Sequence, residues 1–302
     1  MEDCRRFLER IVLELEDSME NKFIISQDGK TLIGVNDKRI QNAVIPYGVT
    51  AINESAFEGC ESLQTLIMPD TVTSIGQGAF MWCESLQEIH LSNSIDTIPD
   101  SAFWGCHSLK SITIPNSVEL IEPCAFWDCY SLESIYLPEN LIYIGPCAFY
   151  ECHGLQNIKI PSNLIQICES TFNKCWSLTD IDIPPKIRLI DRQSFYECHS
   201  LKSVDISLGV SGIADDAFYG CRELRKISIP QSIKMIGKYI FNGCELLKDI
   251  YIHHTTPQTI DISEDAFSFE ILRKTTLHVP ASCRWEYRNH PVFGEFKNID
   301  FY

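Results

Sequence analysis

The amino-acid sequence predicts a repeat solenoid, in which short parallel strands from successive coils stack into one continuous sheet. Three columns of residues predict this fold. Phe recurs every 23 residues, a Cys follows each Phe by three residues, and a Leu follows each Cys by three. Because a single unit has too few apolar residues to form its own core, neighbouring units must stack and share one. The repeating Phe residues are Phe57, Phe80, Phe103, Phe126, Phe149, Phe172, Phe195, Phe218 and Phe241.

One strand is predicted in each unit. Branched residues recur nine and eleven residues after each Phe, as Ile112 and Ile114 do after Phe103. This spacing of two is typical of a strand with one buried face. A Pro usually follows, as at Pro115, and because Pro lacks an N–H it marks the end of the strand. We therefore expect parallel strands near 63–69, 86–92, 109–115 and onward every 23 residues.

The rest of each unit returns the chain to the next strand. This return path carries an Ile in every unit from Ile52 to Ile236, usually followed by an Ala-Phe pair. The Phe and the Cys are three residues apart, so they fall on one side of a helical turn.

The two ends of the chain are predicted to differ from the nine repeats at 46–252. Residues 1–45 read as an N-terminal cap, because solenoid ends expose apolar core. It would consist of an amphipathic helix over 4–19 and a hairpin over 23–33. A partner-binding or membrane helix is the alternative for 4–19. The period breaks after Ile252, and residues 253–302 read as a degenerate tenth repeat and a C-terminal cap.

The repeat resembles a known family. The unit at 109–118, closing with Ile121, Ala125-Phe126 and Cys129, is similar to the BspA-like (Treponema pallidum type) leucine-rich repeat. This resemblance implies a curved right-handed superhelix with its parallel sheet on the concave face. It also implies a surface protein of a bacterium or parasitic protist that binds other proteins. The chain lacks the strict Asn column of the commoner leucine-rich repeats.

Composition excludes several classes of protein. The formal net charge is 25 − 41 = −16, which argues against nucleic-acid binding because phosphates are held by clustered Lys and Arg. No apolar run approaches the roughly 18 to 20 residues of a transmembrane helix, so no membrane insertion is expected. Residues 1–20 are rich in acids and do not read as a secretory signal, which predicts a cytoplasmic protein. The family resemblance implies the alternative, a cell-surface or secreted location.

The chain has 14 Cys, and nine of them form the inward column. Stacking places their Cβ atoms about 4.8 Å apart, beyond the roughly 3.5 to 4.5 Å of a disulfide, so they should be free thiols. Cys124 and Cys147 occupy the same position in adjacent units and are the one pair that could join. No C-x-x-C occurs, so neither a zinc ribbon nor a thioredoxin motif is predicted.

Two columns of ring-bearing residues are candidate sites. His107, His153 and His199 recur in every second unit, about 9 to 10 Å apart, too far for one zinc ion. Tyr130 and Trp176 fill the intervening positions, which favours a surface ladder of flat side chains. A second column could serve either a protein interface or packing between coils: Trp104, Trp127, Tyr150, Tyr196 and Tyr219. With no catalytic constellation, we expect neither an enzyme nor a cofactor.

The remaining candidate is the outward face of the predicted sheet. Residues eight and ten positions after each Phe point outward, and they vary freely along the chain. Asp182 and Asp205 should be direct cross-strand neighbours, and like charges so placed destabilise a sheet. They indicate a partner, a cation or a merely solvated acidic face. The proposed partner-binding residues are Tyr136, Lys159, Asp180, Asp182 and Asp205.

The predicted function is a non-enzymatic scaffold that presents its concave sheet to a protein partner. The alternative is a structural spacer or a self-assembling, adhesin-like surface element. Variation along the outward columns favours the scaffold, because a spacer needs no distinct surface chemistry at each coil.

Overall fold

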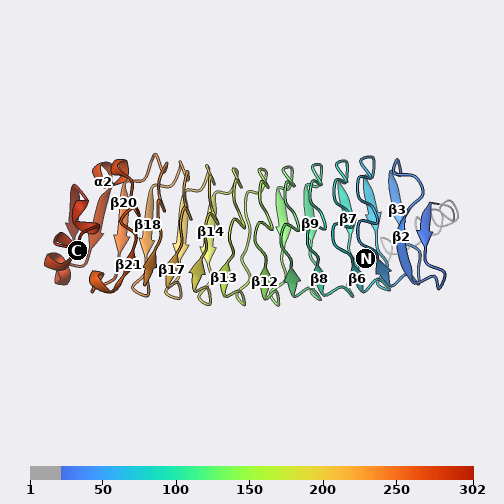
Figure 1. Cartoon of the computed structure of the whole chain (residues 1–302), viewed down its shortest axis with the longest axis horizontal. Coiled ribbons are helices and arrows are strands. Elements are labelled where there is room, and N and C mark those ends of the chain that lie inside the picture. The colour runs from blue at the N-terminus through green and yellow to red at the C-terminus, as the bar shows by residue number, and fades with distance from the viewer. Residues whose placement is uncertain (1–21) are drawn as a thin grey trace, which may run out of the picture.

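The structure is a computed structural model that describes residues 22–302, so the predicted helix over 4–19 lies outside the described residues. Figure 1 shows the coils stacked side by side into a rod that bends little in this view. Each coil contributes strands to two faces of the rod, which we call the front sheet and the back sheet. The repeat solenoid predicted from the 23-residue period is therefore confirmed.

The front sheet contains the strands predicted from sequence. Neighbouring strands are parallel, and from β3 to β20 they pair in a register of 23, as Ile112 pairs with Ile135; the last two pairings, β20 with β22 and β22 with β23, have registers of 27 and 22. The strands form four hydrogen-bonded groups, and residues 157–160 between two of these groups contribute only a bridge from Asn157 to Ser134. The front strands are β3 (Asn42–Val44), β5 (Thr65–Ile67), β7 (Glu88–His90), β9 (Ser111–Thr113), β11 (Ser134–Tyr136), β14 (Asp180–Ile183), β16 (Ser203–Ile206), β18 (Lys226–Ile229), β20 (Asp249–Ile252), β22 (Thr276–Val279) and β23 (Asn298–Phe301).

The back sheet was not predicted as strands. It contains the Ile column of the return path, whose pairs of residues form short parallel strands, and Ile121 pairs with both Ile98 and Ile144. Two residues are too few for an alternating pattern to be recognised in the sequence. The back strands are β4 (Ala51–Ile52), β6 (Ser74–Ile75), β8 (Thr97–Ile98), β10 (Leu120–Ile121), β12 (Tyr143–Ile144), β13 (Gln166–Ile167), β15 (Leu189–Ile190), β17 (Gly212–Ile213), β19 (Met235–Ile236) and β21 (Asp261–Ile262).

The predicted hairpin is present at the N-terminal end of the described chain. Strand β1 (Phe23–Ile25) pairs antiparallel with β2 (Thr31–Val35). Strand β2 also pairs in parallel with β4, so the hairpin extends the back sheet by two strands in the order β1-β2-β4-β6.

The third side of each coil is the segment around the Phe, which we call the Phe turn. In all nine units the residues two before and two after the Phe have a left-handed backbone, as Ser101 (φ 56°) and Gly105 (φ 73°) do. Its hydrogen bonds alternate between the same coil and the next one. The Cys60 N–H donates to the Phe57 carbonyl at 3.0 Å, whereas the Phe57 N–H donates to Ala79 at 2.7 Å. No helix therefore forms at the predicted helical turn within the nine units. The segment is instead a series of turns, and its backbone also bonds to the neighbouring coil.

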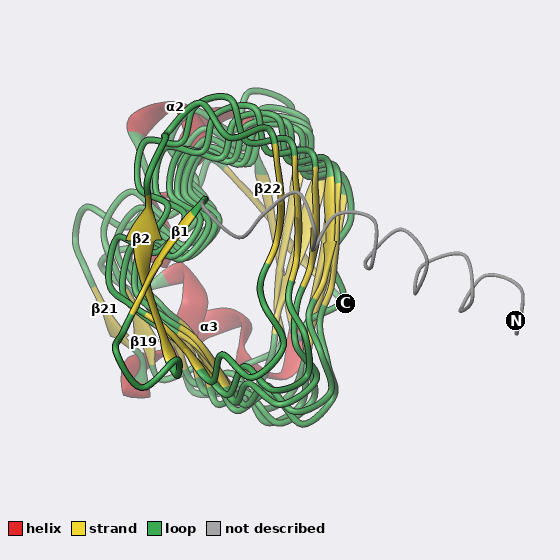
Figure 2. Cartoon of the chain, turned by 90° about the vertical axis from the view of Figure 1, so that its right-hand side faces the viewer, coloured by secondary structure: helices red, strands yellow, loops and turns green. Residues whose placement is uncertain are grey.

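The core is one continuous stack of rings along the rod. The nine repeating Phe side chains are buried, with neighbouring centroids 5.2 to 5.9 Å apart and planes within 25°. The Cys and Leu columns are buried beside them. Figure 2, along the rod, shows the coils enclosing this core between the two sheets and the Phe turns. From Cys83 onward each ladder thiol donates to the Phe carbonyl of the preceding coil, as Cys106 does to Phe80 at 3.3 Å.

The predicted tenth unit closes the C-terminal end of the stack. Its Phe267 stacks on Phe241 at 6.4 Å, and Phe296 meets Phe267 edge-on at 5.0 Å. Short helices surround these rings: η1 (Pro257–Thr259), α2 (Phe269–Lys274), η2 (Ala281–Cys283), α3 (Arg284–Arg288) and η3 (Phe293–Glu295). The division into cap, repeats and cap at residues 45 and 252 stays a prediction.

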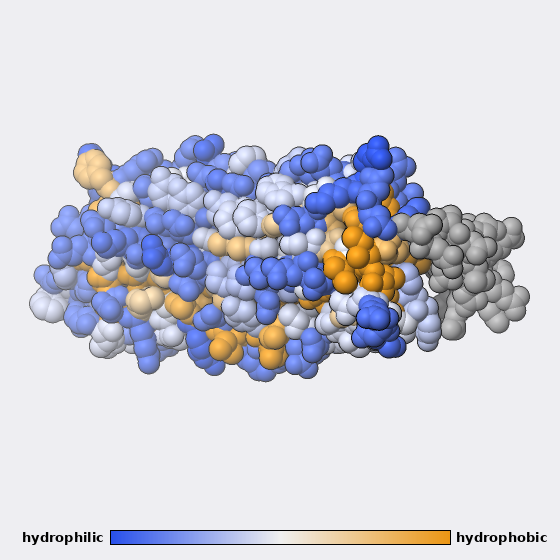
Figure 3. All heavy atoms as spheres, turned by 45° about the vertical axis from the view of Figure 1, so that its right-hand side comes forward, coloured by the Kyte–Doolittle hydropathy of each residue, from blue (hydrophilic) through white to orange (hydrophobic). Residues whose placement is uncertain are grey.

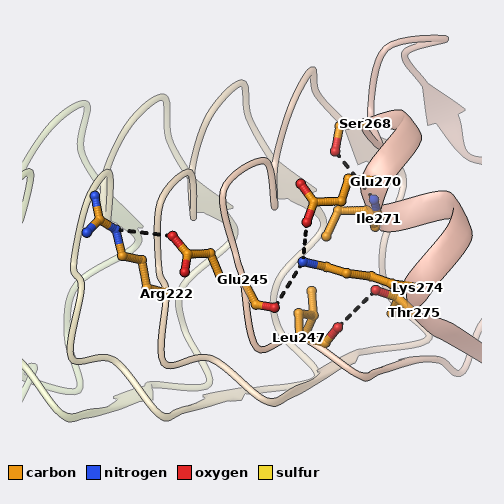
Figure 4. A network of polar contacts seen from close by, with 8 residues as sticks. All are labelled: Arg222, Glu245, Leu247, Ser268, Glu270, Ile271, Lys274 and Thr275. Atoms are coloured by element: carbon orange, nitrogen blue, oxygen red, sulfur yellow. Dashed lines mark hydrogen bonds and ion pairs between the residues drawn. The ribbon is translucent and has the colours of Figure 1, made fainter.

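Polar contacts join α2 to the last regular coil (Figure 4). The Lys274 ammonium donates to the Glu245 carbonyl at 2.9 Å and to the Glu270 carboxylate at 2.8 Å. The Thr275 hydroxyl donates to the buried Leu247 carbonyl at 3.0 Å. These bonds satisfy groups that the end of a coil stack would otherwise leave unpaired.

Candidate interaction face of the front sheet

The acidic part of the front sheet lies on β14 and β16. Side chains alternate along these strands, so Ile181 and Ile183 are buried whereas Asp180, Asp182 and Asp205 are exposed. Asp182 pairs directly with Asp205 across the two strands. The like-charged neighbours predicted from the 23-residue register are therefore present.

Asp180 and the aspartate pair have different surroundings. The Ser203 hydroxyl donates to Asp180 at 2.7 Å, and this bond, followed by one from Thr179, lowers the pKa of the Asp180 carboxyl. Within residues 22–302, neither Asp182 nor Asp205 has a side-chain hydrogen bond or an ion pair. Two like charges thus face each other across paired strands, an arrangement that opposes sheet formation, and both carboxylates remain available to an external cation or donor.

Lys159 brings a positive charge to the same region. It forms an ion pair with Glu139, which raises the pKa of the Lys159 ammonium and lowers that of the Glu139 carboxyl. Residues 157–160 form no regular strand, and beside them the face is hollowed over about 600 Å³. Lys159 and the three aspartates line this hollow. Tyr136, on β11, is 73% exposed and is not among its lining residues.

A neighbouring polar group on the front sheet was missed in the sequence. A second hollow of about 400 Å³ is lined by Asp205 together with Ser228, Tyr251 and His253. The two ring nitrogens of His253 lie 2.7 Å from the Ser228 hydroxyl and 2.6 Å from the Tyr302 hydroxyl. Ser228 and Tyr251 belong to the outward column predicted from sequence, but the proposed binding residues end at Asp205. The acidic region and the polar group thus form one continuous surface.

His278 anchors the C-terminal end of this surface. One ring nitrogen lies 2.8 Å from Asp249 on β20, and the other lies 3.2 Å from Asp300 on β23. The ring stacks on Tyr251 with 4.3 Å between centroids. His278 therefore ties three adjacent strands together and holds Tyr251 in place. In the described part of the chain, no group of three or more His, Cys, Asp and Glu side chains could hold a metal ion.

The two ring columns pack between coils. His153 lies flat on Trp176 with 3.7 Å between centroids, and His107 stacks on Tyr130 at 4.5 Å, which confirms the predicted ladder. In the second column Trp127 stacks on Trp104 at 5.0 Å. Because the ring faces cover one another, these columns offer mainly ring edges to a partner.

The His ladder makes the fold sensitive to acid. Burial lowers the pKa values of His153 and His199, whose Nε2 atoms have no hydrogen-bond partner among the described residues. Unfolding restores a pKa of about 6.5, so stability is fully present above about pH 6.5 and falls as the pH drops through the lowered folded values. We expect the thermal midpoint to fall over that range. Replacing both residues by Tyr, the residue that fills this column at Tyr130, should flatten the profile; equal slopes in variant and wild type would contradict this.

Comparison with known proteins identifies the family. Residues 35–138, 119–248 and 165–284 match the BspA type leucine rich repeat region. These matches span well over half of the chain, which therefore belongs to the BspA-type leucine-rich repeat family. No curated protein matches the sequence.

Solved structures share the fold. A leucine-rich repeat protein from Bacteroides ovatus is 23% identical with a TM-score of 0.78, over 93% of this chain and 74% of that one. The pneumococcal vaccine antigen PcpA is 16% identical with a TM-score of 0.50, over 93% and 83%.

One side of the rod is mostly hydrophilic. Figure 3 shows hydrophobic residues gathered near the N-terminal end of the rod and scattered elsewhere on this side. Within residues 22–302 no helix has the length and apolar character to cross a membrane.

Proposed function

We propose that this chain is a non-enzymatic scaffold that binds another protein through the front sheet. The observation that carries the proposal is the exposed pair Asp182 and Asp205, like charges placed opposite each other on paired strands, with no side-chain hydrogen bond or ion pair among residues 22–302. Two adjacent carboxylates oppose folding, so their presence on this face is better explained if they bind a partner. Membership in a repeat family and a varied outward face support the same function.

The chemistry of the face defines the partner that it would fit. Carboxylates beside the hollow would receive Lys or Arg side chains, and Arg can bind two carboxylates at once. The exposed Tyr136 supplies an aromatic ring with a polar tip, a residue type enriched at protein interfaces. We therefore propose a partner with a basic, hydrogen-bonding surface, which would contact Tyr136, Lys159, Asp180, Asp182 and Asp205.

Replacing Asp182 and Asp205 by Ser tests the proposal. Loss of repulsion should stabilise the fold by about 0.2 to 1 kcal/mol, seen as a slightly higher thermal midpoint. Affinity capture from the source cell, followed by mass spectrometry, should recover a partner with the wild-type chain and lose it with the variant.

A matched control removes two charges elsewhere. Asp96 and Glu119 are exposed, lie on adjacent coils next to the back sheet, and can be replaced by Ser in the same way. The proposal requires this control to retain the partner. A front-sheet variant that melts earlier and still captures the same partner would overturn it. Concentration-dependent self-association without a partner would instead support the spacer or self-assembling alternative.

A further inference from the structure

Cys124 and Cys147 form a pair outside the front sheet. They occupy the same position of the Phe turn in adjacent coils, two residues before the Phe, and both are partly exposed. Each has a left-handed backbone, with φ of 56° and 55°. Because their backbones match and their coils stack directly, the two side chains lie side by side. Ser101 and Ser170 fill this position in the flanking coils.

The two neighbouring thiols affect each other's ionisation. A hydrogen bond between the side chains raises the pKa of Cys124 and lowers that of Cys147. The Ser170 hydroxyl also lowers the pKa of Cys147, against the opposing effects of burial and Glu169. These opposite shifts favour ionisation at Cys147 over Cys124. A thiolate is the nucleophilic form of cysteine, so Cys147 is the reactive member.

The buried ladder provides a contrast within the same two coils. Cys129 and Cys152 are fully buried, and their thiols donate to the carbonyls of Phe103 and Phe126 at 3.1 and 3.2 Å. Burial raises the pKa of both thiols far above the ordinary value. These cysteines are therefore protonated, shielded from solvent and held by core packing.

We propose that Cys124 and Cys147 are an oxidisable dithiol that a peroxide converts into a disulfide between two coils. The Cys147 thiolate attacks the peroxide, its sulfur is oxidised to a sulfenic acid, and hydroxide leaves as the O–O bond breaks. The Cys124 sulfur then displaces the sulfenic hydroxyl, the S–S bond forms, and one water is released. Stacked coils place the two Cα atoms about 4.8 Å apart, within the range that disulfides span. The Cβ atoms of stacked residues also start about 4.8 Å apart, so closing the bond requires these two surface turns to approach each other by a few tenths of an ångström, to within the roughly 4.5 Å that a disulfide allows.

Counting thiols in the full-length chain tests the proposal. The reduced protein, denatured and alkylated with iodoacetamide, should carry 14 labels, one for each Cys. After hydrogen peroxide treatment of the folded protein, 14 − 2 = 12 labels should remain. Cleavage after Glu, which does not occur before Pro123, places Cys124 on the peptide 120–133 and Cys147 on 140–151, so a cross-link between these peptides identifies the bond. Cys129 shares the first peptide, and fragmentation distinguishes it from Cys124.

Two variants make the result specific. Cys124→Ser introduces the residue that flanking coils carry at this position, so it should fold normally and give no cross-link. Cys152→Ser removes a ladder thiol, and its peroxide-treated form should still lose two labels. Fourteen labels after treatment of the wild type would overturn the proposal. So would a cross-link through a ladder cysteine, or one between separate chains.

Discussion

Replacing Phe149 by Ala should destabilise the protein by about 3 to 5 kcal/mol, the range found when a large buried ring is deleted. Phe149 is completely buried in the middle of the ring stack, with Phe126 at 5.5 Å and Phe172 at 5.6 Å. The deletion removes ring contacts on both sides and leaves a cavity between two coils. Urea unfolding followed by circular dichroism measures the loss.

The position of Phe149 adds a qualitative expectation. Stability in a solenoid is close to a sum of terms between neighbouring repeats, so a central defect weakens the coupling between the two halves. We expect the unfolding transition of the variant to broaden or split. Phe57→Ala, next to the terminal hairpin, should keep a single transition, because the long stack beyond it remains intact. Loss of less than about 1 kcal/mol at Phe149 would contradict the ring-stack description of the core.

Replacing Gly145 by Ala should destabilise the fold by about 1 to 3 kcal/mol through overpacking. A Cβ atom at Gly145 would lie 2.5 Å from the nitrogen of Pro123 and 2.8 Å from the carbonyl carbon of Glu122. Both are backbone atoms of the preceding coil, which cannot move aside as a flexible side chain would. The thermal midpoint measures the change.

The same position in another coil supplies the control for Gly145. Asn53 lies four residues before its Phe, as Gly145 does, and already carries a side chain. Asn53→Ala should therefore change the midpoint little. Gly76 and Gly237 share this position, and a Cβ there would also lie within 2.6 Å of backbone in the preceding coil. Midpoints that are equal for the Gly145 and Asn53 variants would show that the coils can separate without cost.

The candidate face was partly predictable. Alternation placed Asp180, Asp182 and Asp205 outward, and the period made Asp182 and Asp205 neighbours. These follow from the sequence because residue i in a regular stack always faces residue i + 23. The hollow beside Lys159 did not follow, because it depends on the irregular backbone at 157–160. The contact of His253 with Tyr302 joins residues 49 positions apart. This separation is not a multiple of the 23-residue period, so the repeat does not predict the contact.

The sequence by itself determined the coil, its register, its buried columns and the family, because a period of 23 repeats one local solution along the whole chain. Only the tertiary structure determined the backbone conformation of the Phe turn. Most of its left-handed positions carry residues other than Gly, such as Cys124 and Cys147, and such residues rarely adopt that backbone. Hydrogen bonds to the adjacent coil hold the backbone there, and these bonds exist only once the coils have stacked.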